Sequence, residues 1–504
     1  MHIALMPWRK VFCGRLVMAA ETSLRAGVVW SAGGRGLSAV ANLAALIIYA
    51  RLLGPEMFGL FALCQAAAVI LHNGLFHWLE SSILRFLPTA ASGRGDLQRS
   101  LFFGYLISFT LLAGFLAVRL LDLKNGLLPV WVAELILPAI LMAAGEAIAA
   151  GTAEAQRATG GVRRFAGLVL LRSLGALVLA IVSIQEFGPT VTAAVYGHAA
   201  GCLIAGFVGL LIWPDTRKSP EAGESLPAVD GLREICRYGA PLSVSLLARL
   251  ATQRVDRFVI AALLGVEAVG IYAVAYDLAR RSIGVPLSLV NLVTYPRMAA
   301  AYDRGDKATV LELGRRNWLG LVLVGVPLAY GLMVVSFSAI PLIFGREFVG
   351  DVTVNIVALA ALAILIEAIR SQHFDISLML VRRTGALAVI SLLTLVMAIV
   401  SVWFLTGWLG LSGAAAATCL TALMALALSV AVGWRELPMP VDGAQILSVI
   451  ILSAMMAMGV AVFSLFVSGW FGLLGQIGVG AILFSIMALR RRSAGLSELT
   501  GWKI

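Results

Sequence analysis

A polar segment opens an otherwise apolar stretch of the chain, RLATQRVDRFVIAALLGVEAVGIYAV; its ionisable residues are Arg249, Arg254, Asp256 and Arg257. An ionisable side chain in membrane hydrocarbon costs about 2.5–3.5 kcal/mol, so charges kept there are expected to face a partner or a polar cavity. On a helix, Arg249, Gln253 and Asp256 share one face, whereas Arg254 points elsewhere. One interpretation is a structural ion pair between Asp256 and a neighbouring arginine. We favour a cavity-lining role, because one carboxylate cannot neutralise three guanidiniums.

Two earlier segments carry polar side chains at helical spacing. One has a stripe of Ser31, Arg35, Ser38 and Asn42, typical either of a hydrogen-bonded helix seam or of a water-filled cavity. Arg35 favours the cavity. The next segment places Glu80 in one sector with His72, and this sector is expected to pair with Arg35. We read each histidine as a hydrogen-bonded bundle residue, without a metal or a proton relay.

Two later segments contain acids close to arginines. Asp277 lies three and four residues before Arg280 and Arg281, so a local ion pair is predicted for at least one of them. The remaining arginine then needs another partner or an anionic ligand. Glu367 and Arg370 are predicted to form a second such pair, three residues apart.

The chain contains an internal repeat. The segment ARLLGPEMFGLFAL, residues 50–63, aligns without gaps on AALLGVEAVGIYAV, residues 261–274. The shared residues include Gly54 with Gly265, Glu56 with Glu267, and Gly59 with Gly270. We interpret the match as a duplication, with the repeats starting near residues 24 and 238.

The composition excludes a soluble globular protein. Hydrophobic residues make up 60 % of the chain and charged residues 13 %, with a mean hydropathy of +0.95, whereas soluble domains are roughly half apolar and a quarter charged. Apolar stretches long enough to cross a bilayer as helices recur throughout, which predicts an all-α polytopic membrane protein with about 14 transmembrane helices. The predicted spans are about 26–50, 57–83, 100–121, 128–150, 166–184, 190–213, 238–263, 268–296, 317–338, 352–372, 385–406, 410–432, 445–468 and 470–489.

The basic residues predict the orientation of these spans. Positive charge gathers on alternate connections and at both ends, whereas the opposite connections hold only Arg51, Arg119, Lys124 and Arg346. By the positive-inside rule, both termini are expected in the cytoplasm. The net charge of +11 is then a topological signal and does not indicate a nucleic-acid partner.

The sequence offers little for catalysis or cofactor binding. It has no glycine-rich phosphate loop, no HExxH segment and no nucleophile elbow, so we expect no enzyme and no catalytic residue. Its five cysteines show no CxxC spacing, so neither a disulfide, a metal site nor a cofactor is predicted.

At LLGPEMFGLFAL, VDRFVIAALLGVEAVGIYAVAY, IFGREF and LGLSGAAAAT the chain resembles the bacterial oligosaccharide flippases, the Wzx-like polysaccharide transporter family of the multidrug/oligosaccharidyl-lipid/polysaccharide exporter superfamily. The resemblance covers residues 24–435. It implies two pseudo-symmetric six-helix lobes around a cavity that opens alternately to the cytoplasm and the periplasm. The expected domains are 1–213, a cytoplasmic linker 214–237, 238–435, and a C-terminal helical hairpin with a tail, 436–504.

The resemblance also implies a function. A flippase of this family moves polyprenyl-diphosphate-linked oligosaccharides across the bacterial inner membrane for O-antigen (lipopolysaccharide), capsule or exopolysaccharide synthesis. Membrane lipid, a polysaccharide polymerase and a chain-length regulator are then expected partners. The substrate's diphosphate is expected at Arg35, Arg249, Arg254 and Arg257. Supporting or coupling roles are expected for Glu80, Asp256, Asp277 and Arg280.

Two features depart from the family pattern and leave alternatives open. The family often has twelve spans, so the last two are an addition or a subgroup feature, and the embedded acids nearly match the arginines in number. A lipid II flippase and a cation-coupled multidrug exporter of the same superfamily therefore remain alternatives. A membrane-embedded glycosyltransferase or polymerase is disfavoured, because every outer connection is short.

Overall fold

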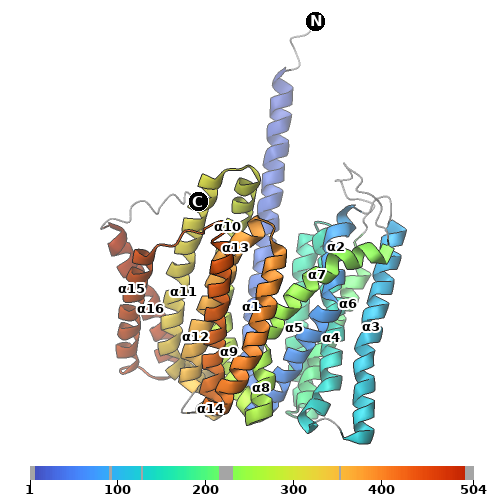
Figure 1. Cartoon of the computed structure of the whole chain (residues 1–504), viewed down its shortest axis with the longest axis vertical. Helices are drawn as coiled ribbons and strands as arrows, with labels where there is room; N and C mark the ends of the chain where they lie inside the picture. Colours follow the sequence, from blue (N-terminus) through green and yellow to red (C-terminus); the bar gives the residue numbers. More distant parts are fainter. Residues whose placement is uncertain (1–5, 90–93, 127–128, 215–230, 351–352, 494–504) are drawn as a thin grey trace. The chain divides into compact units, whose positions relative to one another are not determined.

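The structure is a computed structural model that describes residues 6–89, 94–126, 129–214, 231–350 and 353–493. All regular structure in these ranges is helical (Figure 1). The α-helices of the first half are α1 (Met6–Leu75), α2 (His77–Phe86), α3 (Arg94–Asn125), α4 (Val130–Ala158), α5 (Val162–Phe187), α6 (Val191–Leu211), α7 (Gly231–Thr252) and α8 (Val255–Leu264). Those of the second half are α9 (Val266–Ala279), α10 (Val285–Asp303), α11 (Lys307–Ile343), α12 (Thr353–Ile369), α13 (Asp375–Leu380), α14 (Thr384–Gly433), α15 (Gly443–Ser464) and α16 (Gly469–Ser493). Short 3₁₀ turns, η1 (Leu87–Thr89) and η4 (Arg346–Phe348), and two π-helical turns, η3 (Arg280–Gly284) and η5 (Arg370–Phe374), complete them.

The predicted all-α membrane fold is confirmed. Ten helical stretches among the described residues are long and apolar enough to cross a membrane. Two of them contain two spans each, because α1 turns at Gly54 and α14 turns at Gly410, both with positive φ. The interrupted pairs α7–α8 and α9–α10 form the remaining two spans, which agrees with the expected number of about 14.

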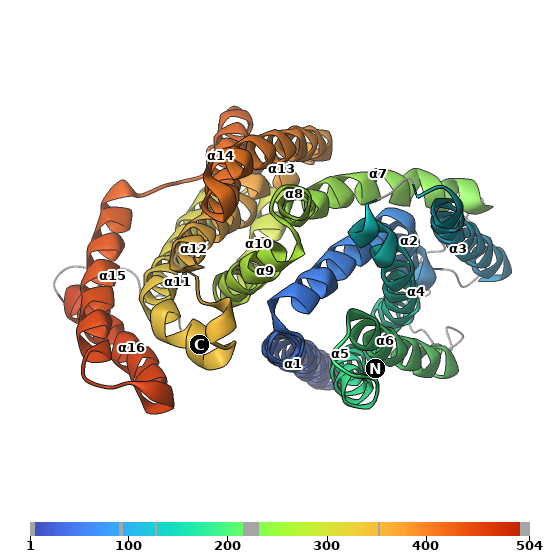
Figure 2. The ribbon, with the colours of Figure 1, turned by 90° about the horizontal axis from the view of Figure 1, so that it is seen from below.

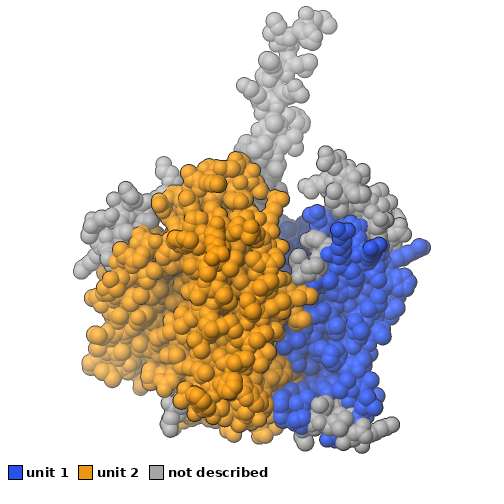
Figure 3. Space-filling view, in the orientation of Figure 1, with its two compact units in different colours: residues 1–45, 67–243 blue, residues 46–66, 244–504 orange. Residues whose placement is uncertain are grey.

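The chain forms two compact units, coloured separately in Figure 3. Unit 1 comprises Met1–Ala45 and Ala67–Ser243, and unit 2 comprises Leu46–Ala66 and Val244–Ile504. Helix α1 thus contributes to both, because residues 46–66 around its Gly54 turn pack with unit 2. The predicted domain boundaries stay a prediction, and most of the expected linker, residues 215–230, lies outside the described residues.

Close helix contacts through glycine organise unit 1. Helices α4, α5 and α6 pack side by side (Figure 2). A Cβ atom at Gly197 or Gly201 of α6 would overlap the α5 backbone, at Ala180 and Ala176 respectively. Glycines on a helix surface let two helices in lipid approach until their backbones touch. Because lipid tails are as apolar as the side chains, such van der Waals packing, and not the hydrophobic effect, holds the helices together.

The internal repeat is visible in unit 2. Gly54 (φ 70°, ψ 175°) and Gly265 (φ 90°, ψ 174°) adopt nearly the same backbone conformation, as a duplication predicts. The two copies also pack against each other. A Cβ atom at Gly59 would overlap the Val266 carbonyl oxygen, and one at Gly270 would overlap the Pro55 carbonyl oxygen.

Arg51, one of the few basic residues on the sparsely charged side of the predicted topology, has a structural partner. Its Nε donates to the Ile343 carbonyl oxygen at 2.6 Å, and its Nη2 donates to the Leu342 carbonyl oxygen. These carbonyls end α11, where a helix exposes unpaired acceptors and negative partial charge. Arg51 therefore caps α11 and ties the first repeat to it.

Candidate functional site

The polar segment found in the sequence interrupts a helix within unit 2. Residues 253–254 form a turn between α7 and α8, so a single predicted span is two half-helices. Backbone that is not helical is tolerated at membrane depth where it is buried in protein or lines a polar cavity. Discontinuous helices of this kind offer a half-helix N-terminus, with its positive partial charge, to anionic groups.

A cavity of about 590 Å³, including the space at its mouth, lies beside this interruption. Arg249, Gln253 and Arg370 supply its basic and amide groups, and α14 contributes the hydroxyls of Ser391, Thr394, Thr418 and Thr421. The lining residues are Arg249, Thr252, Gln253, Tyr276, Ala363, Glu367, Arg370, Ser391, Thr394, Ala398, Val402, Thr418, Thr421 and Ala422. Hydroxyl and amide groups in an otherwise apolar wall can hydrogen-bond a polar ligand from several sides.

Arg249 is the exposed cation of this cavity. It lies in the last turn of α7, and within the described part of the chain no side chain or carbonyl hydrogen-bonds or ion-pairs with its guanidinium. Arg370, in contrast, donates to both oxygens of Glu367 at 2.7 and 2.9 Å and to Asp375 at 2.7 Å. The predicted Glu367–Arg370 pair is confirmed.

Arg257 lies deeper and is only 1 % exposed. Its Nη2 donates to Asp277 Oδ1 at 2.6 Å. Asp256 instead accepts from the Tyr272 hydroxyl at 2.7 Å and from the Arg257 backbone N–H at 2.8 Å. The prediction that Asp277 pairs locally with an arginine of its own helix was wrong: α8 brings Arg257 against it, which no periodicity within one helix reveals.

The other predicted basic residues surround the helix interruption. Arg280, the first residue of η3, donates to Gln253 Oε1 at 2.5 Å and so braces one cavity residue. Arg254 directly precedes α8 but makes no side-chain hydrogen bond to its first turn, and its buried Nη1 has no hydrogen-bond partner among the described residues. The two π-helical turns begin at Arg280 and Arg370, and such turns commonly mark functional sites.

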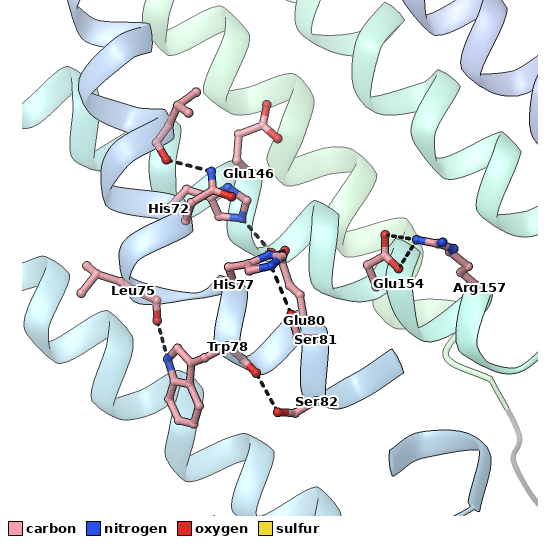
Figure 4. Close-up of polar contacts among 12 residues, drawn as sticks. His72, Leu75, His77, Trp78, Glu80, Ser81, Ser82, Glu146, Glu154 and Arg157 are labelled. Atoms are coloured by element: carbon pink, nitrogen blue, oxygen red, sulfur yellow. Dashed lines mark hydrogen bonds and ion pairs between the residues drawn. The ribbon is translucent and has the colours of Figure 1, made fainter. Parts of the chain in front are cut away.

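Unit 1 contains a separate set of paired charges (Figure 4). Glu80 is buried and accepts from His72 Nε2 at 2.7 Å, with His77 Nδ1 3.5 Å from its other oxygen. The side chain of the expected partner, Arg35, is not among those that the structure describes, and neither is that of Ser31 in the same stripe. Ser38, from that stripe, hydrogen-bonds Ser173 of α5 at 2.5 Å, which is the behaviour of a helix seam.

Sequence reasoning missed a second pairing in unit 1 and the hydroxyl wall of unit 2. Arg172 Nη1 on α5 lies 2.5 Å from Glu146 Oε2 on α4. Each is a charged residue in one of two neighbouring predicted spans, so their pairing could have been predicted from the sequence. The hydroxyls of α14, Ser391, Thr394, Thr418 and Thr421, had no such signal, because isolated Ser and Thr are ordinary in membrane helices.

Comparison with known proteins identifies the class of protein. The sequence profile of a family described as polysaccharide biosynthesis protein matches residues 24–301, more than half of the chain. The chain therefore belongs to this polysaccharide biosynthesis family, and the resemblance found in its sequence is confirmed. A search of curated protein sequences gives no match.

Solved structures show the same fold. The lipid II flippase MurJ in an inward closed conformation has a TM-score of 0.69 at 13 % identity, covering 92 % of this chain and 99 % of its own. An inward-facing multidrug resistance MATE transporter of the MOP superfamily has a TM-score of 0.57 at 18 % identity, covering 79 % and 94 %. A MOP superfamily transporter from Pyrococcus furiosus has a TM-score of 0.55 at 18 % identity, covering 82 % and 95 %. The chain therefore shares the fold of these solved membrane proteins.

Proposed function

We propose that the protein is a flippase that moves polyprenyl-diphosphate-linked oligosaccharide repeat units from the cytoplasmic to the periplasmic leaflet by alternating access. The observation that carries the proposal is the position of Arg249. Its guanidinium faces a hydroxyl-lined cavity in an apolar bundle and forms no ion pair with the described residues, whereas Arg370 is paired. A lone guanidinium in such surroundings is costly unless an anion binds it. A diphosphate is such an anion, and it accepts two parallel hydrogen bonds from one guanidinium.

The residues of the cavity then divide the substrate between them. Arg249 in the cavity and Arg254, which directly precedes α8 and is not a lining residue, bind the diphosphate beside the α7–α8 interruption, and the hydroxyls of α14 hydrogen-bond the sugar hydroxyls. The polyprenyl tail stays in the bilayer. Arg35 and Arg257 are kept as further diphosphate ligands, and Arg257 reaches a ligand only when its ion pair with Asp277 opens.

The acidic groups provide the coupling in this proposal. Asp277 holds the Arg257 side chain while the site is empty, Asp256 accepts from the Tyr272 hydroxyl and the Arg257 backbone N–H, and Arg280 keeps Gln253 in place. Glu80, with His72 and His77 beside it, is the coupling carboxylate of unit 1.

The cellular setting follows from the function. The protein resides in the bacterial inner membrane with both termini in the cytoplasm, and it supplies repeat units to a polysaccharide polymerase under a chain-length regulator. Its pathway makes O-antigen, capsule or exopolysaccharide. The four-part division into 1–213, 214–237, 238–435 and 436–504 belongs to the same proposal.

A lipid II flippase is the second candidate, favoured by the similarity of fold to MurJ. A cation-coupled multidrug exporter is less well supported, because it needs a carboxylate in the cavity that no arginine neutralises. The acid that lines this cavity, Glu367, is paired with Arg370.

Mass spectrometry of lipid-linked sugars in a strain lacking the protein tests the proposal. We expect one polyprenyl-diphosphate oligosaccharide to accumulate in the cytoplasmic leaflet while its polymer disappears outside the cell. Accumulation of lipid II instead would establish the second candidate. New sensitivity to cationic drugs without any accumulated lipid would indicate the exporter.

A further inference from the structure

Three side chains that can bind a metal ion meet inside unit 1: Glu146 of α4 with His198 and Cys202 of α6. Glu146 Oε1 lies 3.7 Å from His198 Nε2 and 3.6 Å from Cys202 Sγ, and all three ligand atoms are within 4.8 Å of one another. Tetrahedral Zn²⁺ binds oxygen and nitrogen at about 2.0–2.2 Å and sulfur at about 2.3 Å, which places its ligand atoms roughly 3.3–3.8 Å apart. The carboxylate oxygen therefore lies at the spacing that one ion requires.

The helices hold these atoms in place. His198 and Cys202 are four residues apart on α6, so both project from the same face. Gly145 precedes Glu146, and a Cβ atom there would lie 3.0 Å from the Ala199 carbonyl oxygen and 3.2 Å from Cys202 Cβ. Helices α4 and α6 thus touch at the level of the three ligands. A site built on tightly packed helices loses little conformational entropy when an ion binds.

Arg172 orients the carboxylate without blocking it. Its Nη1 lies 2.5 Å from Glu146 Oε2, which leaves Oε1 toward His198 and Cys202. Outer groups that hydrogen-bond a ligand commonly fix its orientation in metal sites. The guanidinium carries one positive charge and the divalent ion two. The carboxylate and the thiolate offset two of these three charges.

We propose that Glu146, His198 and Cys202 bind Zn²⁺ or a similar transition-metal ion, which joins α4 to α6 within unit 1. Imidazole and thiolate select such ions, whereas Na⁺, Mg²⁺ and Ca²⁺ prefer oxygen ligands. The Cys202 thiol, which now donates to Glu146, releases its proton to solvent when sulfur binds the ion. Water fills the fourth position, since the Glu146 and His198 side chains are 26 % and 14 % exposed. The sequence predicted no metal site, because its five cysteines show no CxxC spacing.

Cobalt titration of the purified full-length protein in detergent tests the proposal. With Co²⁺ as the probe, we expect one equivalent to produce the near-ultraviolet absorption band of a thiolate–cobalt bond. Cys202→Ser should abolish the band, and His198→Gln should weaken Co²⁺ binding by about tenfold or more. Cys236→Ser, which removes another thiol of unit 1, should leave the band unchanged.

Thermal unfolding with Zn²⁺ gives a second readout. Zn²⁺ should raise the unfolding temperature of the wild type and of Cys236→Ser, but not that of His198→Gln, because an ion that binds only the folded state stabilises it. His198→Gln keeps all the cysteines, so a normal circular dichroism spectrum separates lost binding from lost folding. A wild type that shows no band at one equivalent, or a band that survives Cys202→Ser, would overturn the proposal.

Discussion

In unit 1 the embedded carboxylates Glu80 and Glu146 each have a basic side chain beside them, on the same or the next helix. In unit 2, by contrast, Arg249 faces a cavity, and its guanidinium forms no ion pair or hydrogen bond with the described residues. Unit 2 also has a fully engaged arginine, Arg257, only eight residues along the chain from Arg249. Two arginines of one polar segment therefore differ in what they do. A buried pair fixes helices, and an unpaired cation in a cavity is available to a ligand.

The largest effect is expected from Arg257→Ala. The change leaves Asp277 charged and buried, and breaking a buried ion pair from one side destabilises a protein by about 3–5 kcal/mol. Thermal or denaturant unfolding of the purified protein checks this. The double variant Arg257→Met/Asp277→Leu, which removes both charges, should recover most of the loss. If Arg257→Ala unfolds like the wild type, the Arg257–Asp277 pair does not stabilise the packing of α8 against α9.

The crossing of the two repeats is the next most sensitive point. In Gly270→Ala the new methyl group meets the backbone carbonyl of Pro55, and overpacking of this kind costs about 1–3 kcal/mol. Gly167→Ala is the matched control, because a Cβ atom there has no neighbour within 4 Å. We expect a lower unfolding temperature for the first variant only. Equal unfolding temperatures would show that α1 and α9 separate freely at this crossing.

The Glu80 group should show coupling between its members. Glu80→Gln and His72→Gln each remove a charge-assisted hydrogen bond worth about 1.5–3 kcal/mol. The double variant should lose less stability than the two single losses combined, because both act on one interaction. Denaturant unfolding of the four proteins measures this. Strictly additive losses would mean that Glu80 and His72 do not form a pair in the membrane-embedded protein.

Arg51→Ala should give the smallest effect. It removes two hydrogen bonds to the end of α11 at an exposed position, and a typical hydrogen bond contributes about 0.5–1.5 kcal/mol. Arg51→Lys keeps the charge but not the forked geometry, so it should recover only part of the loss. A small drop in unfolding temperature with normal transport is the expected result. Loss of transport with normal stability would place Arg51 in the transport pathway.

The sequence predicted the fold because its signals are long and repeated. Apolar stretches of about 20 residues define spans one by one, and the duplicated LLG turns gave the repeat whose glycines, Gly54 and Gly265, share a conformation. The pairing of charges was harder to predict. Glu367 with Arg370 was readable because both lie on one helix, whereas Arg257 with Asp277 and Arg172 with Glu146 depend on which helices touch.

Periodicity also could not distinguish the two kinds of arginine. Arg249 and Arg257 both occur in an apolar context, and the difference between them is burial, which arises from the packing of α9 and α14 against α8. The cavity's hydroxyl wall and the Glu146–His198–Cys202 cluster were invisible for the same reason. Ser391 and Thr394 meet Thr418 and Thr421 only across the Gly410 turn of α14, and Glu146 lies 52 and 56 residues before His198 and Cys202.

The most direct test is the affinity of the purified full-length protein for a polyprenyl-diphosphate sugar, compared between the wild type and Arg249→Ala. Loss of one charge-assisted contact of about 1.5–3 kcal/mol should weaken binding roughly ten- to a hundredfold, while the unfolding temperature stays unchanged because Arg249 is exposed. Arg249→Lys should bind with intermediate affinity. Wild-type affinity in Arg249→Ala would contradict the assignment of this cavity as the site for the diphosphate.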